Sequence, residues 1–133
     1  MSESEFITEI AERSGSGILL DLNNIYINAF NLGVDTELYL KEVPVDLVGE
    51  MHLAGGEKKG DLIIDSHNCP IWDEVWELYE RAIKRFGSTP TLIEWDNDLP
   101  EFETLEKEAE KAAEIINSNS DIALTGIAEG IRA

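Results

Sequence analysis

Apolar residues follow two patterns along this chain: recurrence every three or four positions, and short continuous runs. Helical recurrence is found in residues 6–11, 36–42, 71–86 and 102–116. A short apolar run, typical of a strand buried on both faces, is found in residues 17–22, and further strands are predicted over residues 47–53 and 91–95. The order is helix, strand, helix, strand, helix, strand, helix. This alternation predicts an α/β fold with a parallel sheet and helices packed on it.

Local signals mark the ends of these elements. Ser2 followed by Glu5 is a capping box before the first helix, and Gly87 follows the third as a C-cap. Residues 25–35, around Asn31 and Gly33, predict a loop or irregular turn. Residues 57–60 predict a charged turn, and residues 62–64 a short apolar piece after it.

The length of 133 residues fits one domain. Residues 1–117 hold the predicted sheet and helices, and residues 118–133 are predicted to be a linker and a weakly structured tail. Three main strands are too few for a closed eight-stranded barrel, which needs about 250 residues. The fold is therefore either a small open sheet or part of a barrel.

Charge restricts the partners of the chain. Ten Lys and Arg residues against 28 Asp and Glu residues give a net charge of −18. That charge repels phosphate backbones and anionic membrane surfaces, so we expect neither nucleic acid nor membrane as a partner. The N-terminal residues show no signal peptide, and the single cysteine, Cys69, suits a reducing compartment. These features predict a cytoplasmic protein.

Polar side chains with metal-binding chemistry follow the predicted strands. They are Asp21, Asn23 and Asn24 after the first strand, Glu50 and His52 in the second, Asp65 and His67 after the short apolar piece, and Glu94 and Asp96 at the third. The carboxyl ends of parallel strands meet at one edge, where α/β proteins build their sites. Carboxylates and imidazoles of this kind suit iron, manganese or zinc.

Each of these residues also has a purely structural interpretation. His52 fits a hydrogen-bonded residue at a strand end, and Glu94 fits a core carboxylate satisfied by a partner. Asp21 and Asn23 fit caps of the following turn. By contrast, Asp65 and His67 stand two residues apart, so in an extended segment they project to the same side and could share a metal. The three tryptophans are expected in the core.

Four segments together resemble one known family. They are Leu-Leu-Asp-Leu-Asn-Asn-Ile-Tyr (19–26), Val-Gly-Glu-Met-His-Leu-Ala-Gly (48–55), Ile-Asp-Ser-His (64–67) and Leu-Ile-Glu-Trp-Asp-Asn (92–97). They resemble the multinuclear non-haem iron-dependent oxidative enzymes, in family order and spacing, from about residue 2 to about residue 116. The resemblance implies half of a TIM barrel of the xylose isomerase-like type, with two or three irons at the mouth of the complete barrel.

The resemblance also implies roles for individual residues. His52, Asp65, His67 and Glu94 fall on metal-ligand positions, as do Asp21 and Asn24 of the Asp-x-x-Asn element. Glu50, Asn23 and Asp96 would support these ligands from beside them. Phe30 and Leu32 occupy a loop region where many relatives carry a histidine. The metal would be iron, or another divalent ion.

By resemblance, the chain is the C-terminal part of an enzyme that oxidatively modifies cysteine in ribosomally made precursor peptides, together with a peptide-recognition partner protein. The N-terminal half of the family, which supplies further ligands, is not in this sequence. The open strand edges are then expected to pair with that missing half or with a second copy in a homodimer. Two other functions stay open: a divalent-metal barrel enzyme such as a sugar isomerase, and a non-catalytic acidic oligomerisation or interaction module.

Overall fold

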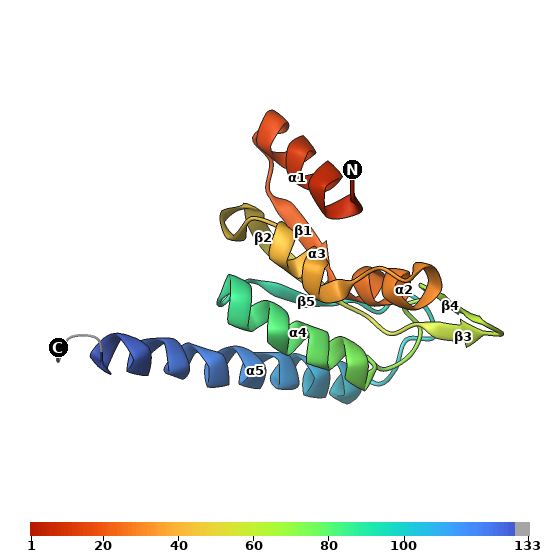
Figure 1. Cartoon of the computed structure of the whole chain (residues 1–133). Helices are drawn as coiled ribbons and strands as arrows, with labels where there is room; N and C mark the ends of the chain where they lie inside the picture. The colour runs from red at the N-terminus through yellow and green to blue at the C-terminus, as the bar shows by residue number, and fades with distance from the viewer. Residues whose placement is uncertain (130–133) are drawn as a thin grey trace.

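The computed structural model describes the backbone of residues 1–129 and the side chains of residues 1–119. The helices are α1 (Glu3–Ser14), α2 (Leu22–Leu32), α3 (Thr36–Glu42), α4 (Asp73–Phe86) and α5 (Phe102–Glu129), with a short 3-10 helix η1 (Val45–Leu47). The strands are β1 (Ile18–Asp21), β2 (Val48–Leu53), β3 (Glu57–Lys59), β4 (Leu62–Ile64) and β5 (Thr91–Ile93). Figure 1 shows their arrangement.

The main sheet has the strand order β1-β2-β5, and both pairs are parallel. Asp21 lies opposite His52, and His52 lies opposite Leu92 in the next strand. Helices alternate with these strands along the chain, which confirms the predicted parallel α/β arrangement. The arrangement is consistent with part of a TIM-barrel-like fold.

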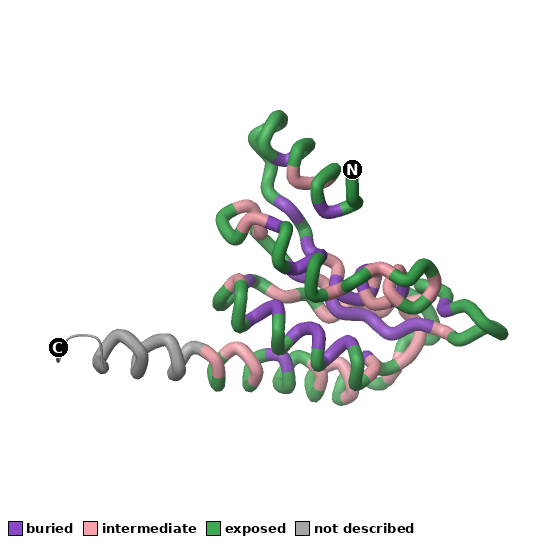
Figure 2. The backbone as a smooth tube through the Cα atoms, in the orientation of Figure 1, coloured by how far each residue is buried: buried purple, intermediate pink, exposed green. Residues whose placement is uncertain are grey.

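The core lies on one face of this sheet. Met51 and Leu53 of β2 are fully buried there with Val75 and Tyr79 of α4. Figure 2 shows buried stretches in purple along the strands and along α4. The alternate side chains point to the other face, where Leu19 and Leu92 stay 49% and 45% exposed. Parallel sheets are normally covered on both faces. In a TIM barrel the helices cover only the outer face of the strands, and the inner face lines the interior of the barrel. The uncovered face of this sheet corresponds to that inner face.

Local signals explain the ends of several helices. At α1 the predicted capping box is present, because the Ser2 hydroxyl accepts from the Glu5 amide and the Glu5 carboxylate accepts from the Ser2 amide. Gly15 ends α1 in a left-handed conformation with φ 73°. Helix α4 ends before Gly87, as its sequence predicts.

The predicted loop over residues 25–35 is wrong, because most of it belongs to α2. The Asp21 carboxylate caps this helix by accepting a hydrogen bond from the Asn24 amide at 2.9 Å. Leu22, Asn23, Ile25 and Ile27 are buried, so α2 is covered around most of its circumference. The asparagines of α2 instead form hydrogen bonds with other elements: Asn23 with Asp65, Asn28 with Glu3, and Asn31 with the main chain of Ile63.

The charged turn and apolar piece over residues 57–64 are in fact an antiparallel hairpin, β3–β4. Gly60 makes its turn possible with φ 62°. At the other end of the chain, α5 continues to Glu129, through most of the segment for which the sequence predicts a linker. Trp76 is buried as expected, whereas Trp72 and Trp95 are only partly buried. Within residues 1–129 the structure holds no helix both long and apolar enough to cross a membrane.

Candidate metal centre

Three neighbouring strands bring a carboxylate, an imidazole and a second carboxylate to one place. Asp21 ends β1, His52 lies opposite it in β2, and Glu94 follows β5. The Glu94 amide donates to the Leu53 carbonyl at 2.8 Å, which continues the β2–β5 pairing up to the site. One ligand atom from each of the three side chains lies within 4.8 Å of the others. The structure thus brings these predicted ligands together at the carboxyl edge of the sheet.

A second group lies beside the first and shares Glu94 with it. The His67 Nδ1 atom is 3.5 Å from Glu94 Oε2 and 3.1 Å from Asp96 Oδ2. His52 Nδ1 is 3.2 Å from the same Glu94 oxygen. One oxygen of the Glu94 carboxylate therefore lies within 3.5 Å of both histidine rings.

The loop that carries His67 is held in an unusual conformation. His67 has φ 49°, a left-handed value that residues other than glycine rarely adopt. Its amide donates to the Gly55 carbonyl at 3.1 Å, and its carbonyl accepts from the Asp96 and Asn97 amides. The predicted extended conformation from Asp65 to His67 is therefore wrong. Strain of this kind persists only where surrounding contacts enforce it, as they do here.

Asp65 contacts the opposite ring nitrogen of His67. Its Oδ1 is 2.7 Å from His67 Nε2. The same oxygen accepts from the buried Asn23 amide at 2.6 Å, and Oδ2 accepts from Asn24 at 3.2 Å. The side chains of Asn23 and Asn24 thus orient the Asp65 carboxylate by hydrogen bonds, and Asp65 in turn orients the His67 ring.

Asp96, which was expected beside the ligands, is itself a member of the second group, whereas Glu50 lies beside the first group. Glu50 Oε1 lies 3.5 Å from His52 Nε2, so both nitrogens of this ring face a carboxylate as well. Asn97 was missed at the sequence level: its side chain donates to the Ser66 carbonyl at 3.0 Å and so ties the two site loops together. Its position after Asp96 in the fourth motif is the one signal that marks it.

The charge in this cluster is strongly negative. Five carboxylates, those of Asp21, Glu50, Asp65, Glu94 and Asp96, surround two histidines. Over the residues with described side chains, no lysine or arginine forms an ion pair with any of the five. Burial lowers the pKa of His67, but Asp65, Glu94 and Asp96 outweigh burial and raise that pKa above 6.5. Carboxylates gathered without basic partners favour a bound cation.

Fold and site together define the class: a β/α protein with a carboxylate and imidazole cluster, suited to cations, at the carboxyl edge of a parallel sheet. The chain belongs to the family described as RiPP precursor modification enzyme MbnB/TglH/ChrH, whose family model matches residues 1–117. RiPPs are ribosomally made, post-translationally modified peptides. The family resemblance seen in the four motifs is thereby confirmed.

Curated relatives agree with this membership. A UPF0276 protein of Chromobacterium violaceum is 47% identical over 116 residues, which are 87% of this chain and 42% of that protein. One from Paraburkholderia phytofirmans is 45% identical over 129 residues, or 93% of this chain and 42% of that protein. One from Vibrio parahaemolyticus is 46% identical over 121 residues, which are 88% of this chain and 42% of that protein. The chain spans about two fifths of the length of these relatives.

Proposed function

We propose that this chain supplies part of the metal centre of an iron-dependent oxidative enzyme that modifies cysteine in ribosomally made precursor peptides. The observation that carries the proposal is Glu94, whose carboxylate is shared by the His52 group and the His67 group. A family of precursor-peptide modification enzymes supplies the substrate class.

The donor set fits iron. Imidazoles and carboxylates suit Fe(II) and leave positions open for substrate. The thiol of Cys69 donates to the Gly56 carbonyl at 3.0 Å and belongs to neither ligand group. Asp21, His52 and Glu94 would hold one ion, and His67, Glu94 and Asp96 a neighbouring one; Asp65 and Asn24 adjoin the second. Bound iron would supply the oxidation of the peptide by dioxygen.

Residues of this chain orient the proposed ligands and favour a proton on the His67 ring. Asn23 and Asn24 hold Asp65, and Asp65 holds the His67 ring with Nε2 toward it. A cation that binds through His67 must displace the proton that the surrounding carboxylates favour there. Metal affinity is therefore expected to increase with pH.

The bare face and free edges of the sheet require a partner polypeptide. A groove of about 780 Å³ runs between the edge strand β5 and α5, with Leu92, Phe102 and Leu105 among its lining residues. Two copies of the chain would provide two sets of three main-sheet strands, which is short of the eight of a closed barrel. Two chains of −18 would also repel each other. We therefore favour the remainder of the family fold over a homodimer as the occupant.

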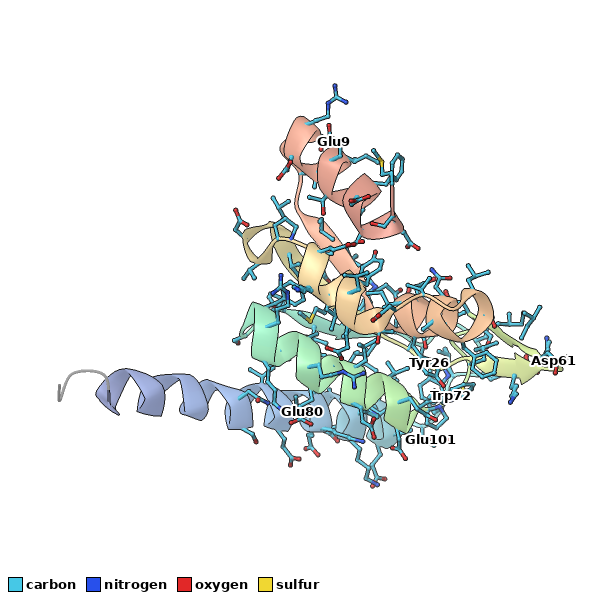
Figure 3. All side chains as sticks on the ribbon, viewed as in Figure 1. Glu9, Tyr26, Asp61, Trp72, Glu80 and Glu101 are labelled. Atoms are coloured by element: carbon cyan, nitrogen blue, oxygen red, sulfur yellow. The ribbon has the colours of Figure 1, made fainter. Side chains whose placement is uncertain are left out.

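Metal binding tests the proposal directly. The chain is loaded with Fe(II) without oxygen, desalted and analysed for iron. We expect bound iron in the wild type, loss of most of it in Glu94→Gln, and no change in Glu101→Gln, whose exposed carboxylate lies just before α5 (Figure 3). A folded wild-type chain that binds no iron would overturn the metal assignment.

Activity is tested with the chain and the remaining part of a full-length relative expressed together. A cysteine-containing precursor peptide is incubated with this pair, iron and dioxygen, and its mass is followed. We expect a mass change at cysteine that His67→Ala abolishes. If the pair instead interconverts an aldose and a ketose, the chemistry is that of a sugar isomerase. A pair that binds iron and changes neither substrate contradicts the peptide assignment.

A further inference from the structure

The β3–β4 hairpin lies outside the main sheet, but its second strand leads directly into the metal centre. The hairpin projects from the body of the molecule, with Asp61 near its tip (Figures 1 and 3). Strand β4 ends at Ile64, and the next residue is Asp65, whose carboxylate lies 2.7 Å from the His67 ring. The position of the Asp65 main chain therefore depends on how β4 is held.

A side chain of α2 takes the place of a neighbouring strand along β4. The Asn31 Nδ2 atom donates to the Ile63 carbonyl at 2.8 Å, and the Asn31 Oδ1 atom accepts from the Ile63 amide at 2.9 Å. One side-chain amide thus satisfies both main-chain groups of one strand residue, as a paired strand would. The Ile63 side chain is itself buried, at 2% exposure.

This contact links the main chain of the hairpin to the rest of the molecule. Among the residues with described side chains, Asn31 is the only one outside the hairpin that bonds to the main chain of residues 57–65. The next links come after Asp65, where the main chain of residues 66–67 bonds to the body. Asp65 is therefore held between two fixed points, Ile63 before it and residues 66–67 after it.

Loss of the Asn31 amide would leave the Ile63 amide and carbonyl without partners. Unpaired main-chain groups beside a buried side chain are costly, and these two would regain partners if the strand moved toward water. A displacement of about 1 Å is enough to lengthen the 2.7 Å contact between Asp65 and His67 beyond hydrogen-bond distance. The side chains of Asn23 and Asn24 bond only to the carboxylate of Asp65, so they do not fix its main chain.

We propose that Asn31 is a positioning residue of the metal centre: by holding β4 at Ile63, it sets the place from which Asp65 orients the His67 ring. Both side-chain bonds of Asn31 go to Ile63, so it acts through the strand, about 7 Å of main chain before Asp65. Its effect on cation binding rests on the proposed function, whereas its effect on the His67 ring does not.

The first measurement uses the full chain without metal. A long-range proton–nitrogen NMR spectrum shows the imidazole nitrogens, and because the sequence has only two histidines, His52 serves as an internal reference. We expect Asn31→Ala to shift the ring nitrogens of His67 and to leave those of His52 nearly in place. Asp65→Asn supplies the signature of a His67 ring without its carboxylate partner, and Asn31→Ala should shift His67 in the same direction.

Two further variants separate this role from a general loosening of α2. Asn28→Ala is the matched control, because Asn28 is the same residue type on the same helix and makes an exposed bond to Glu3 at 3.2 Å; both rings should stay as in the wild type. Asn31→Asp keeps an acceptor for the Ile63 amide but sets an oxygen against the Ile63 carbonyl, so it should shift His67 as Asn31→Ala does. Urea unfolding of each variant ensures that only folded chains are compared.

The second measurement is the affinity for Fe(II), taken without oxygen on the same variants. We expect Asn31→Ala to weaken Fe(II) binding about tenfold, as the loss of a group that orients a ligand does. Asn28→Ala should bind Fe(II) as the wild type does.

Each outcome decides the proposal. An unshifted His67 ring in folded Asn31→Ala, or equal shifts of both rings, overturns it. If Asn31→Ala does not fold, Asn31→Asp decides in its place by the same spectrum. A His67 shift without loss of Fe(II) affinity overturns the role of Asn31 in cation binding. A His67 shift in a chain whose wild type binds no iron contradicts only the proposed function, whereas iron binding with an unshifted His67 ring contradicts only the role of Asn31.

Discussion

Gly55 lies where the second motif passes beneath the loop of the third, and adding one methyl group there should damage the fold. A Cβ atom at this position would lie 2.1 Å from the Cys69 carbonyl oxygen and 2.6 Å from that of Pro70. Both obstacles are main-chain atoms, so the 69–70 segment must move by about 1.3 Å for the 2.1 Å approach to reach an ordinary contact of 3.4 Å. Overpacking of a well-packed interior costs about 1–3 kcal/mol and occasionally more. We expect Gly55→Ala to lower the free energy of unfolding by about 3 kcal/mol.

The assay is urea unfolding followed by circular dichroism, with Gly49→Ala as the matched control. Nothing lies within 4 Å of a Cβ at Gly49, so that variant should match the wild type or gain up to about 1 kcal/mol. Because the Gly55 carbonyl also accepts from the His67 amide, Gly55→Ala should weaken iron binding by about tenfold or more. If Gly55→Ala unfolds within about 0.5 kcal/mol of Gly49→Ala, the described packing of these two motifs is wrong.

Two further predictions concern the support of the cluster. Asn23→Ala removes the hydrogen bond from a buried side chain to the Asp65 carboxylate and should lower the free energy of unfolding in urea by about 2 kcal/mol. Asn24→Ala removes a longer and exposed bond to the same carboxylate and should lower it by less than about 1 kcal/mol. Equal losses would contradict the assigned roles. The raised pKa of His67 predicts that the metal-free protein has a stability contribution that is fully present below pH 6.5 and is lost as the pH rises through the raised value. Urea unfolding across this pH range should show that decline in the wild type and not in His67→Ala, and a wild-type stability that rises with pH would contradict it.

The sheet and most residues of the candidate site could be predicted from sequence because their signals are local. The apolar run over residues 17–22 indicates a strand from the local sequence alone, and parallel strands of one sheet have their carboxyl ends at the same edge. That rule brings Asp21, His52 and Glu94 together without any knowledge of loop conformation. Capping signals such as Ser2 with Glu5 are equally local, and they gave the start of α1 correctly.

Features fixed by distant contacts could not be predicted. Helix α2 is rich in asparagine, and although its Asp21 cap is local, its burial depends on neighbours that are remote in sequence, such as β4. The strands of the hairpin have three residues each, too few for an alternating pattern, and Asn31 holds β4 from another element. The left-handed turn at His67 is imposed by the Gly55 carbonyl and the Asp96 amide, which are remote in sequence.

The Asp21 carboxylate has two simultaneous duties: it caps α2 through the Asn24 amide and it faces His52 and Glu94. Its orientation is therefore set by the helix before any ion arrives. The other acidic side chains of the cluster likewise keep protein partners of their own. The carboxylates of the cluster are consequently positioned by contacts within the protein, whether or not a cation lies among them.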